Sequence, residues 1–264
     1  MFNSNLLAKD LLNNSNYYFH TNKAMIEINN VSLSYVKDLK VIDNINFKVD
    51  DGTVFGFIGP NGAGKTTTIE MITGVLNIDE GDILIDGKSI KNNPLEAKKQ
   101  FGFVPDTPDV FEKLTGLEYL NFIGDIYDVP EKVRLEKVKK LSEEFGISKF
   151  LKDRIQSYSH GMRQKLLIIS VLLHNPKNWI LDEPMTGLDP KASYTLKKLM
   201  REHASQGNTV FFSTHVLEVA EKLCDKIAVI DKGKIIFVGT CDEIKEKSKS
   251  NSSLEESFLK IIEG

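Results

Sequence analysis

The sequence is poor in cysteine and contains neither a long apolar run nor a secretion signal, the features that mark secreted and membrane-embedded proteins. Only two of its 264 residues are cysteine, Cys224 and Cys241, with neither metal-ligand spacing nor a disulfide framework around them. No stretch approaches the roughly 18 consecutive apolar residues that a spanning helix requires. The first 20 residues lack the basic start and the apolar centre of a secretion signal. The sequence therefore predicts a protein of a reducing cytoplasm, with any membrane role exercised through a partner.

An excess of charge of one sign is also missing. The formal net charge is −3, so the chain has no general attraction to polyanions, and nucleic acid is not its expected partner. Three lysines do cluster at Lys137, Lys139 and Lys140, as they would in a nucleic-acid-binding patch. Glutamates are interleaved with them, which favours the alternative of a solvated helix face.

The hydrophobic pattern predicts an α/β domain with a helical insertion. Alternating apolar residues begin at Met25 and indicate half-buried strands, whereas the continuous run Val54-Phe55-Gly56-Phe57-Ile58 is typical of a central parallel strand. Helical spacing dominates from about residue 107 to residue 174, after which strand patterns return. We therefore expect a loosely ordered extension (1–23), the α/β domain (24–240) and a tail of one short amphipathic helix (241–264).

A Gly-rich loop follows the continuous apolar run. Gly59-Pro60-Asn61-Gly62-Ala63-Gly64-Lys65-Thr66 fits the pattern G-x-x-x-x-G-K-[ST], and Thr67 continues into a predicted helix. Inward-pointing backbone N–H groups and the positive end of the helix form a cradle for nucleotide phosphates. A chance match on a Gly-rich turn is the alternative, but the position between a buried strand and a helix favours the cradle. Lys65 would then contact the β- and γ-phosphates, and the Thr66 hydroxyl would bind Mg²⁺.

Two carboxylates end a later apolar strand. Trp179-Ile180-Leu181 leads into Asp182 and Glu183, and ligands of open α/β sheets bind at that carboxyl edge. Asp182 can hold Mg²⁺, and Glu183 is placed to orient or deprotonate an attacking water. A strand that stops at a polar turn is the alternative, which the upstream phosphate loop disfavours. His215 ends another apolar strand; a lone histidine is more often structural, but at this edge it is a candidate γ-phosphate sensor.

Together these motifs resemble the ATP-binding cassette (ABC) ATPases, the nucleotide-binding subunits of ABC transporters. The resemblance covers about residues 25–240 and depends most on Tyr158-Ser159-His160-Gly161-Met162, which occupies the place of the family signature Leu-Ser-Gly-Gly-Gln. It implies a P-loop NTPase core, with a RecA-like parallel sheet, an antiparallel β-subdomain and an inserted α-helical subdomain. It also implies that Ser159 and Gly161 face the ATP of a second subunit, so that two chains enclose two ATP molecules. Taken alone, this segment would indicate only a capped helix.

The sequence departs from the family pattern in two places. His160 and Met162 replace a glycine and a glutamine of the signature, which alters its contacts but leaves Ser159 and Gly161 in place. Asp106 stands where the family has a glutamine that links Mg²⁺ and the attacking water to the membrane partner. A carboxylate there can approach Mg²⁺, but it has no amide donor and adds negative charge.

Two further residues gain an expected role from the resemblance. Tyr35 matches the aromatic position that stacks on adenine, and the alternative is a tyrosine that belongs to the core. Asp189, which follows the acidic strand, is expected to contact nucleotide.

The resemblance implies an ATP-hydrolysing motor subunit. We expect ATP and Mg²⁺ as cofactors, a homodimer, a membrane permease as partner and a place on the inner face of the cell membrane. Multidrug, bacteriocin or antimicrobial-peptide export is the favoured direction, by analogy alone. One alternative is a cassette ATPase that acts with soluble partners, as in iron–sulphur cluster assembly. Another is a translation or DNA-repair cassette, but those carry two cassettes or long coiled coils, and this sequence shows neither.

Overall fold

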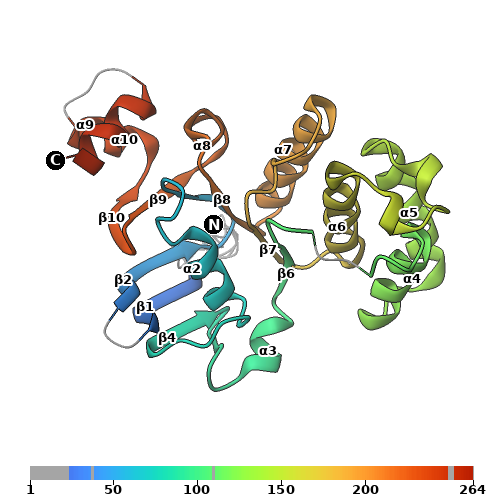
Figure 1. Cartoon of the computed structure of the whole chain (residues 1–264), viewed down its shortest axis with the longest axis horizontal. Coiled ribbons are helices and arrows are strands. Elements are labelled where there is room, and N and C mark those ends of the chain that lie inside the picture. Colours follow the sequence, from blue (N-terminus) through green and yellow to red (C-terminus); the bar gives the residue numbers. More distant parts are fainter. Residues whose placement is uncertain (1–23, 37–38, 109–110, 249–252, 264) are drawn as a thin grey trace, which may run out of the picture.

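The computed structural model describes residues 24–36, 39–108, 111–248 and 253–263, so the expected extension at residues 1–23 lies outside the described part. The described chain forms two sheets with helices around them (Figure 1). A four-stranded antiparallel sheet has the order β2-β1-β4-β5, and a six-stranded sheet has the order β10-β9-β3-β8-β7-β6. The strands are β1 (Ala24–Val36), β2 (Leu39–Asp50), β3 (Val54–Ile58), β4 (Glu80–Ile85), β5 (Lys88–Ser89), β6 (Phe101–Val104), β7 (Asn178–Leu181), β8 (Thr209–Thr214), β9 (Lys226–Asp231) and β10 (Lys234–Gly239).

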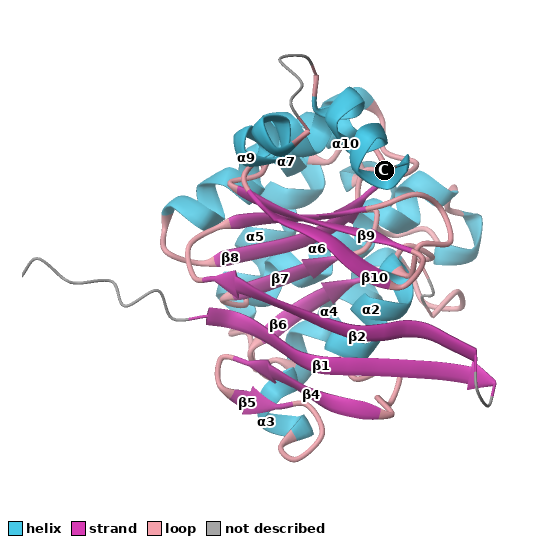
Figure 2. Cartoon of the chain, turned by 90° about the vertical axis from the view of Figure 1, so that its left-hand side faces the viewer, coloured by secondary structure: helices cyan, strands magenta, loops and turns pink. Residues whose placement is uncertain are grey.

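The helices lie around both sheets, and Figure 2 shows α9 and α10 at one end of the molecule and α3 beside β5 at the other. No helix within the described ranges is both long and apolar enough to span a bilayer. The helices are α2 (Lys65–Ile72), α3 (Pro94–Lys98), α4 (Gly116–Ile126), α5 (Glu131–Glu144), α6 (His160–His174), α7 (Pro190–Ser205), α8 (Leu217–Leu223), α9 (Cys241–Lys247) and α10 (Leu254–Glu263), with 3₁₀ turns at Ser148–Phe150 and Ile155–Ser157.

Strand β3 lies at the centre of the six-stranded sheet. It pairs in parallel with both β8 and β9, and all five of its residues are buried. This confirms the parallel strand expected from the continuous apolar run, because a strand covered on both faces needs apolar side chains on both. Strands β7 and β6 continue the parallel order beyond β8. The carboxyl ends of β3, β8, β7 and β6 therefore lie side by side at one edge.

Stacked aromatic rings join the two sheets. Phe47 of β2 lies 5.5 Å from Phe57 and 6.0 Å from Phe55, both on β3, and 6.3 Å from Phe211 on β8, measured between ring centroids. Offset stacking at such distances adds to the free energy of apolar burial. The antiparallel sheet is thereby held against the strand that leads into the phosphate loop.

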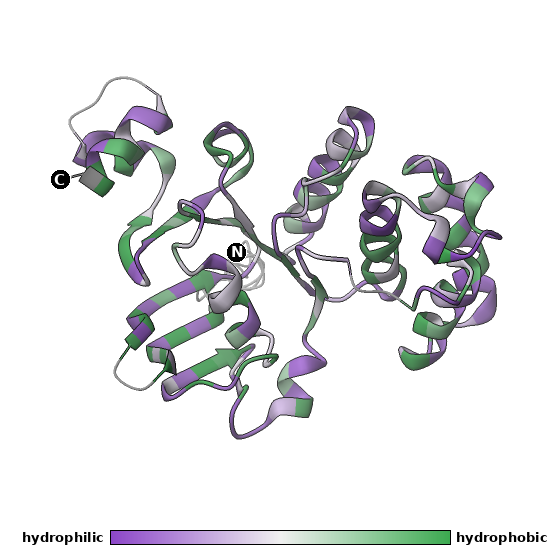
Figure 3. Ribbon diagram, in the orientation of Figure 1, coloured by the Kyte–Doolittle hydropathy of each residue, from purple (hydrophilic) through white to green (hydrophobic). Residues whose placement is uncertain are grey.

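The predicted insertion at residues 107–174 forms a helical layer built from α4, α5 and α6. Residues Leu166–Leu173 of α6 are buried, and Figure 3 shows how apolar this helix is. Helix α4 begins at a capping box, in which the Thr115 hydroxyl accepts from Glu118 N and the Glu118 carboxylate accepts from Thr115 N. One apolar cluster includes side chains of α4, α5, α6, α7, β7 and β8, so the layer is continuous with the core.

The tail differs from the single helix expected, because it forms two. Helix α9 begins at a capping box between Thr240 and Glu243 and ends at Lys247. The sequence from Ser248 to Ser253 contains no apolar side chain, so it has no helix face to bury. Leu254 and Phe258 of α10 then join an apolar cluster with residues of β3, α8, β9 and β10.

Candidate functional site

Residues that follow β3, β6 and β7 meet around a cavity of about 250 Å³. The strand ends adjoin one another, as parallel order requires, so segments far apart in sequence reach one place. The lining residues are Val41, Asn61, Gly62, Gly64, Lys65, Thr66, Thr67, Asp106 and Glu183. Most of the expected phosphate-loop residues, the expected base and the unusual aspartate are therefore brought together.

The loop between β3 and α2 depends on glycines at two positions. A Cβ on Gly59 would lie 2.3 Å from the carbonyl oxygen of Ile230 on β9, which no larger residue could tolerate. Gly64 caps α2 in the left-handed region, with φ of +107°, where glycine alone is unstrained. Ala63 N donates to Pro60 O at 3.2 Å and closes the turn. The loop is thereby held against β9 with the N-terminal end of α2 facing the cavity.

Lys65 is buried and lies between loop carbonyls and a carboxylate. Its Nζ donates to Gly59 O at 2.9 Å and to Pro60 O at 3.3 Å. The same nitrogen lies 3.5 Å from Oε1 of Glu183. The ammonium group is thus fixed at the mouth of the loop, where it supplies positive charge to an anion in the cavity.

Asp182 is the most deeply buried carboxylate of the site, with 1% of its surface exposed. Burial raises its pKa, and the carboxylates of Asp106 and Glu183 raise it further. Hydrogen bonds from the hydroxyls of Ser213 and Thr66 oppose this shift in pKa. A buried carboxylate crowded by like charges is a position at which a cation would relieve repulsion.

The oxygen groups of the site fit Mg²⁺. Within the described residues, no group of three or more His, Cys, Asp or Glu side chains could hold a metal ion by itself. Mg²⁺ is commonly bound by one or two carboxylates together with substrate phosphates. Asp182, Asp106 and the Thr66 hydroxyl offer hard oxygen ligands of this kind.

Glu183 is held from three sides in an unusual backbone conformation. Its φ is +44°, in the left-handed region, which costs of order 1–3 kcal/mol for a residue with a side chain. Its N–H donates to Ser213 Oγ at 2.8 Å. Its Oε1 lies 3.0 Å from Nδ1 of His215, which is partly exposed at the end of β8. Backbone, serine and histidine together direct the carboxylate into the cavity.

Tyr35 reaches the same region from the antiparallel sheet. It is 59% exposed, and its hydroxyl lies 3.4 Å from Thr67 Oγ1. A tyrosine of the core would be buried, so the exposure argues against that alternative and leaves a ring face accessible beside α2.

Ser159, Gly161 and Asp189 form a separate cluster that does not line the cavity. Ser159 Oγ accepts from Met162 N at 3.3 Å and caps α6. Asp189 caps α7 by accepting from Ala192 N at 2.9 Å, and it also forms an ion pair with Lys165. Both caps follow the preferences of helix N-termini. The local geometry thus gives Asp189 a structural role within its own chain.

Two residues that contact the site residues were not predicted from the sequence. Ser213 connects Asp182 to the backbone of Glu183, yet in the sequence it is only a small polar residue near the end of an apolar strand. Gly187 packs against the signature segment, since a Cβ on Gly161 would lie 2.4 Å from its carbonyl oxygen. His174 and His203 stack on Tyr127 and Trp179, respectively. His20 lies outside the described residues.

Comparison with known proteins agrees with this geometry. The family model described as ABC transporter matches residues 42–186. The uncharacterized ABC transporter ATP-binding protein YhcH of Bacillus subtilis is 39% identical over 220 residues, which is 82% of this chain and 70% of that protein. The linearmycin resistance ATP-binding protein LnrL of the same organism is 32% identical over 245 residues, 90% of this chain and 78% of that protein. A solved structure of the ATP-binding subunit of an ABC transporter superposes with a TM-score of 0.85 at 32% identity, and the match covers 90% of this chain and 99% of that one.

Proposed function

The chain belongs to the ABC transporter family as an ATP-binding, ATP-hydrolysing subunit, and from this we propose that two copies enclose two ATP molecules and drive a membrane permease in export. The observation that carries the proposal is the convergence of the phosphate loop, Asp106 and Glu183 on one cavity. YhcH and the superposed structure are described as ATP-binding proteins of ABC transporters, which does not favour a cassette that acts with soluble partners.

The phosphate loop binds the triphosphate in this proposal. Backbone N–H groups of residues 59–67 and the positive end of α2 face the phosphates. Lys65 exchanges its loop carbonyls for phosphate oxygens, and the exposed ring of Tyr35 stacks on the adenine. Asp182, Asp106 and the Thr66 hydroxyl would hold Mg²⁺, which would supply positive charge to neutralise the phosphates. The buried, crowded position of Asp182 supports this assignment.

Glu183 orients and deprotonates the attacking water. Its carboxylate lies beside the phosphate loop, and the contact at 3.0 Å to His215 keeps its direction. His215 is partly exposed at the same edge, so it can also contact the γ-phosphate and report its presence.

The second subunit completes the site. Ser159 and Gly161 lie at the exposed start of α6, where a capped helix N-terminus attracts an anion. Because this segment does not line the cavity of its own chain, it is free to face the γ-phosphate of a partner copy. Asp189, fixed at the start of α7, lies on the same side of the subunit as its ion-pair partner Lys165 and contributes to the contact between copies.

An apolar surface on the helical layer is proposed to bind the permease at the inner face of the membrane. Phe111 lies 5.5 Å from Phe122 and 6.5 Å from Tyr119 between ring centroids. Phe111, Phe122 and Ile126 are exposed, which is unusual for large apolar side chains grouped together. Export is favoured by the similarity to LnrL, a linearmycin resistance ATP-binding protein.

The test is Glu183→Gln, which keeps the shape of the side chain and removes the proposed base. We expect steady-state ATP hydrolysis to fall at least about a hundredfold, while gel filtration with Mg-ATP shows a stable dimer. The control is Lys65→Ala, which should lose both ATP binding and the dimer. Unchanged turnover in Glu183→Gln would remove the residue from its role. A wild-type protein that binds Mg-ATP and never dimerises would overturn the two-copy arrangement.

A further inference from the structure

Ser213 lies where the carboxyl ends of β7 and β8 meet. The last residue of β7 pairs in parallel register with Phe212 of β8. Asp182 and Ser213, which follow these two residues, are therefore brought side by side. Asp182 N also donates to Val104 O of β6 at 2.8 Å, so the carboxylate starts from a backbone held on both sides. Ser213 has none of its surface exposed, and its hydroxyl depends on protein partners rather than on bulk water.

The Ser213 hydroxyl makes two hydrogen bonds, and both go to residues of the nucleotide site. It donates to Oδ1 of Asp182 at 2.5 Å and accepts from the N–H of Glu183 at 2.8 Å. A hydroxyl carries one proton, and a backbone N–H can only donate, so that proton is left for the carboxylate. One hydroxyl thus joins the side chain of an expected Mg²⁺ ligand to the backbone of the proposed base.

The bond from Glu183 to Ser213 holds a costly backbone conformation. The φ of Glu183 is +44°, and such a conformation persists only where surrounding contacts impose it. The Glu183 side chain contacts Lys65 at 3.5 Å, but a triphosphate would draw that ammonium group away. The bond to Ser213 lies outside the lining of the nucleotide cavity, so nucleotide does not compete for it. It can therefore hold Glu183 in place while ATP is bound.

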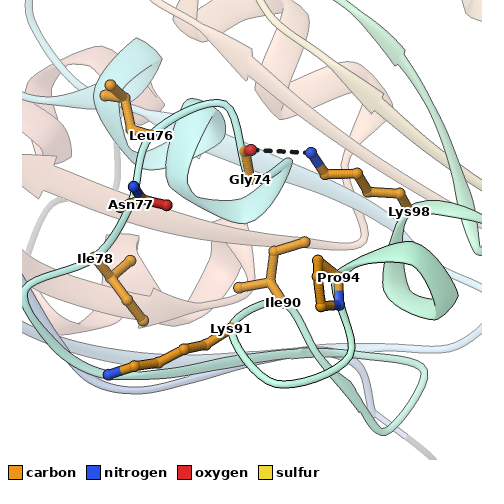
Figure 4. A pocket seen from close by; sticks show the side chains of 8 residues that line it. All are labelled: Gly74, Leu76, Asn77, Ile78, Ile90, Lys91, Pro94 and Lys98. Atoms are coloured by element: carbon orange, nitrogen blue, oxygen red, sulfur yellow. Dashed lines mark hydrogen bonds between the residues drawn. The ribbon is translucent and has the colours of Figure 1, made fainter.

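Burial decides how much the loss of such a bond matters, as a second hydrogen bond beside α2 illustrates. Across a cavity of about 360 Å³ between α3 and the loop after α2, the exposed Lys98 Nζ donates to Gly74 O at 3.0 Å (Figure 4). Water can replace either partner of that bond, so its loss has little effect. Bulk water does not reach Ser213. Removal of its hydroxyl would leave the N–H of Glu183 without this acceptor and Asp182 without this donor.

We propose that Ser213 is a positioning residue for ATP hydrolysis, because one hydroxyl fixes the carboxylate of Asp182 relative to the backbone of Glu183. The proposal rests on the roles proposed above for these two carboxylates, and it adds the residue that makes them move as a unit. Ser213 does not line the nucleotide cavity, so it is not needed to bind the phosphates. Its loss should lower kcat and the effect of Mg²⁺, and should leave the affinity for ATP itself unchanged.

The test compares Ser213→Ala, which removes the hydroxyl, with Ser213→Thr, which keeps it. In steady-state hydrolysis we expect the kcat of the alanine variant to fall about ten- to a hundredfold, since displacements of about 1 Å in an active site cost on the order of a hundredfold in rate. The KM for ATP, and the Kd for ATP measured in EDTA, should stay within about threefold of wild type. Addition of Mg²⁺ should strengthen ATP binding less in the alanine variant, measured by calorimetry. The threonine variant should keep at least about a third of the wild-type kcat.

Amide hydrogen exchange gives a readout that does not depend on activity. In the nucleotide-free protein, the Glu183 N–H should exchange at least about tenfold faster in Ser213→Ala, because it has lost its acceptor, while the N–H groups of β8 should exchange as in wild type. Ser142→Ala is the matched control. Ser142 is 1% exposed, and its hydroxyl donates to Lys139 O of its own helix at 3.1 Å. This variant should leave both kcat and the exchange of Glu183 unchanged.

The outcomes separate this role from the proposed function. A kcat of Ser213→Ala within twofold of wild type, or unchanged exchange at Glu183, would overturn the role of Ser213. A threonine variant that folds and is as slow as the alanine variant would also overturn it, and if threonine prevents folding, the alanine and exchange results decide. Equal losses in Ser142→Ala would show a general effect of a lost buried hydroxyl and would likewise overturn the role. Unchanged turnover in Glu183→Gln, in contrast, contradicts the proposed base itself, whatever Ser213→Ala shows.

Discussion

Among single residues, Gly161 is one at which the structure leaves no room for a side chain. Its backbone approaches Gly187 so closely that a Cβ would lie 2.4 Å from the carbonyl oxygen. Its φ is not positive, so the requirement is for space rather than for backbone freedom. The contact joins the start of α6 to the loop that follows Glu183, and movement of one must therefore move the other.

Gly161→Ala should therefore impair hydrolysis without preventing folding. The added methyl group must displace either α6 or the loop after Glu183, and displacements of about 1 Å in an active site cost on the order of a hundredfold in rate. We expect the kcat for ATP to fall by about ten- to a hundredfold in a steady-state assay. Gly146→Ala is the matched control, because a Cβ there meets nothing within 4 Å. It should lower the free energy of unfolding by about 1 kcal/mol, from its positive φ, and leave kcat unchanged.

The sequence predicted the roles of the site residues better than it predicted the contacts that hold them in place. The phosphate loop and Glu183 were placed together from motif order and strand position, because parallel strands bring their carboxyl ends to one edge, whereas Asp106 was added only by the resemblance to the ABC family. The bridge by Ser213 was not predictable, since it depends on which face of β8 a small side chain occupies. The left-handed backbone of Glu183 has no signature in the sequence either.

At the scale of elements, the tail makes more contacts with the core than a short terminal helix was expected to make. Leu254 is fully buried in an apolar cluster with Ile58, the last residue of β3, and Ala220 of α8. Lys245 of α9 pairs with Glu221 of α8 at 2.6 Å. Helix α8 begins two residues after His215, so the tail is packed against elements that lead directly into the site.

Loss of this packing should destabilise α8 in particular. Leu254→Ala removes a fully buried side chain and should lower the free energy of unfolding by about 2 to 5 kcal/mol in urea denaturation. Leu259→Ala, on the same helix but 48% exposed, should change it by no more than about 0.5 kcal/mol. Hydrogen exchange should accelerate in α8 of the first variant before it does in β7. Equal exchange rates in wild type and Leu254→Ala would contradict the proposed support.

Strands and helices were predictable where their side chains are fully buried on one or both faces, and less predictable where the element is short. The strands expected from Met25, at the continuous apolar run, before Asp182 and before His215 are present as β1, β3, β7 and β8, and the insertion is helical as expected. Strand β5, of two residues, carries too few side chains for a hydrophobic periodicity to be detected. In the tail, the pattern Ser-Leu-Glu-Glu-Ser-Phe-Leu-Lys-Ile-Ile-Glu-Gly predicted the helix that is α10, whereas α9 was not predicted as a separate helix.

For the whole molecule, three apolar clusters each include strands of the six-stranded sheet. The buried His203 and the half-buried His174 each stack on an aromatic ring. His203 stacks on Trp179 at 4.0 Å and its Nε2 lies 3.0 Å from Lys177 O. His174 stacks on Tyr127 at 3.7 Å. Burial lowers the pKa of both rings, so the folded protein keeps them neutral where an unfolded chain would protonate them.

Stability should consequently decline on mild acidification. Above an unfolded-state pKa of about 6.5, both states hold neutral histidines and these rings add no pH dependence. Below it the unfolded chain binds more protons than the folded one, so each ring lowers the free energy of unfolding by up to about 1.4 kcal/mol per pH unit. The loss continues until the lowered folded-state pKa is reached. Urea denaturation between pH 7.5 and 5.5 should show a smaller slope for His203→Gln than for wild type, and identical slopes would contradict this account.

The contact between Lys65 and Glu183 has a consequence for the timing of catalysis. The Nζ of Lys65 lies 3.5 Å from Oε1 of Glu183. The same nitrogen would be attracted by a bound triphosphate, so the two anions would compete for it. A polyanion competes for that cation far more strongly than a single carboxylate does. Arrival of the nucleotide would thus release Glu183 to His215 and to water, so that the proposed base becomes available only once there is a phosphate to attack.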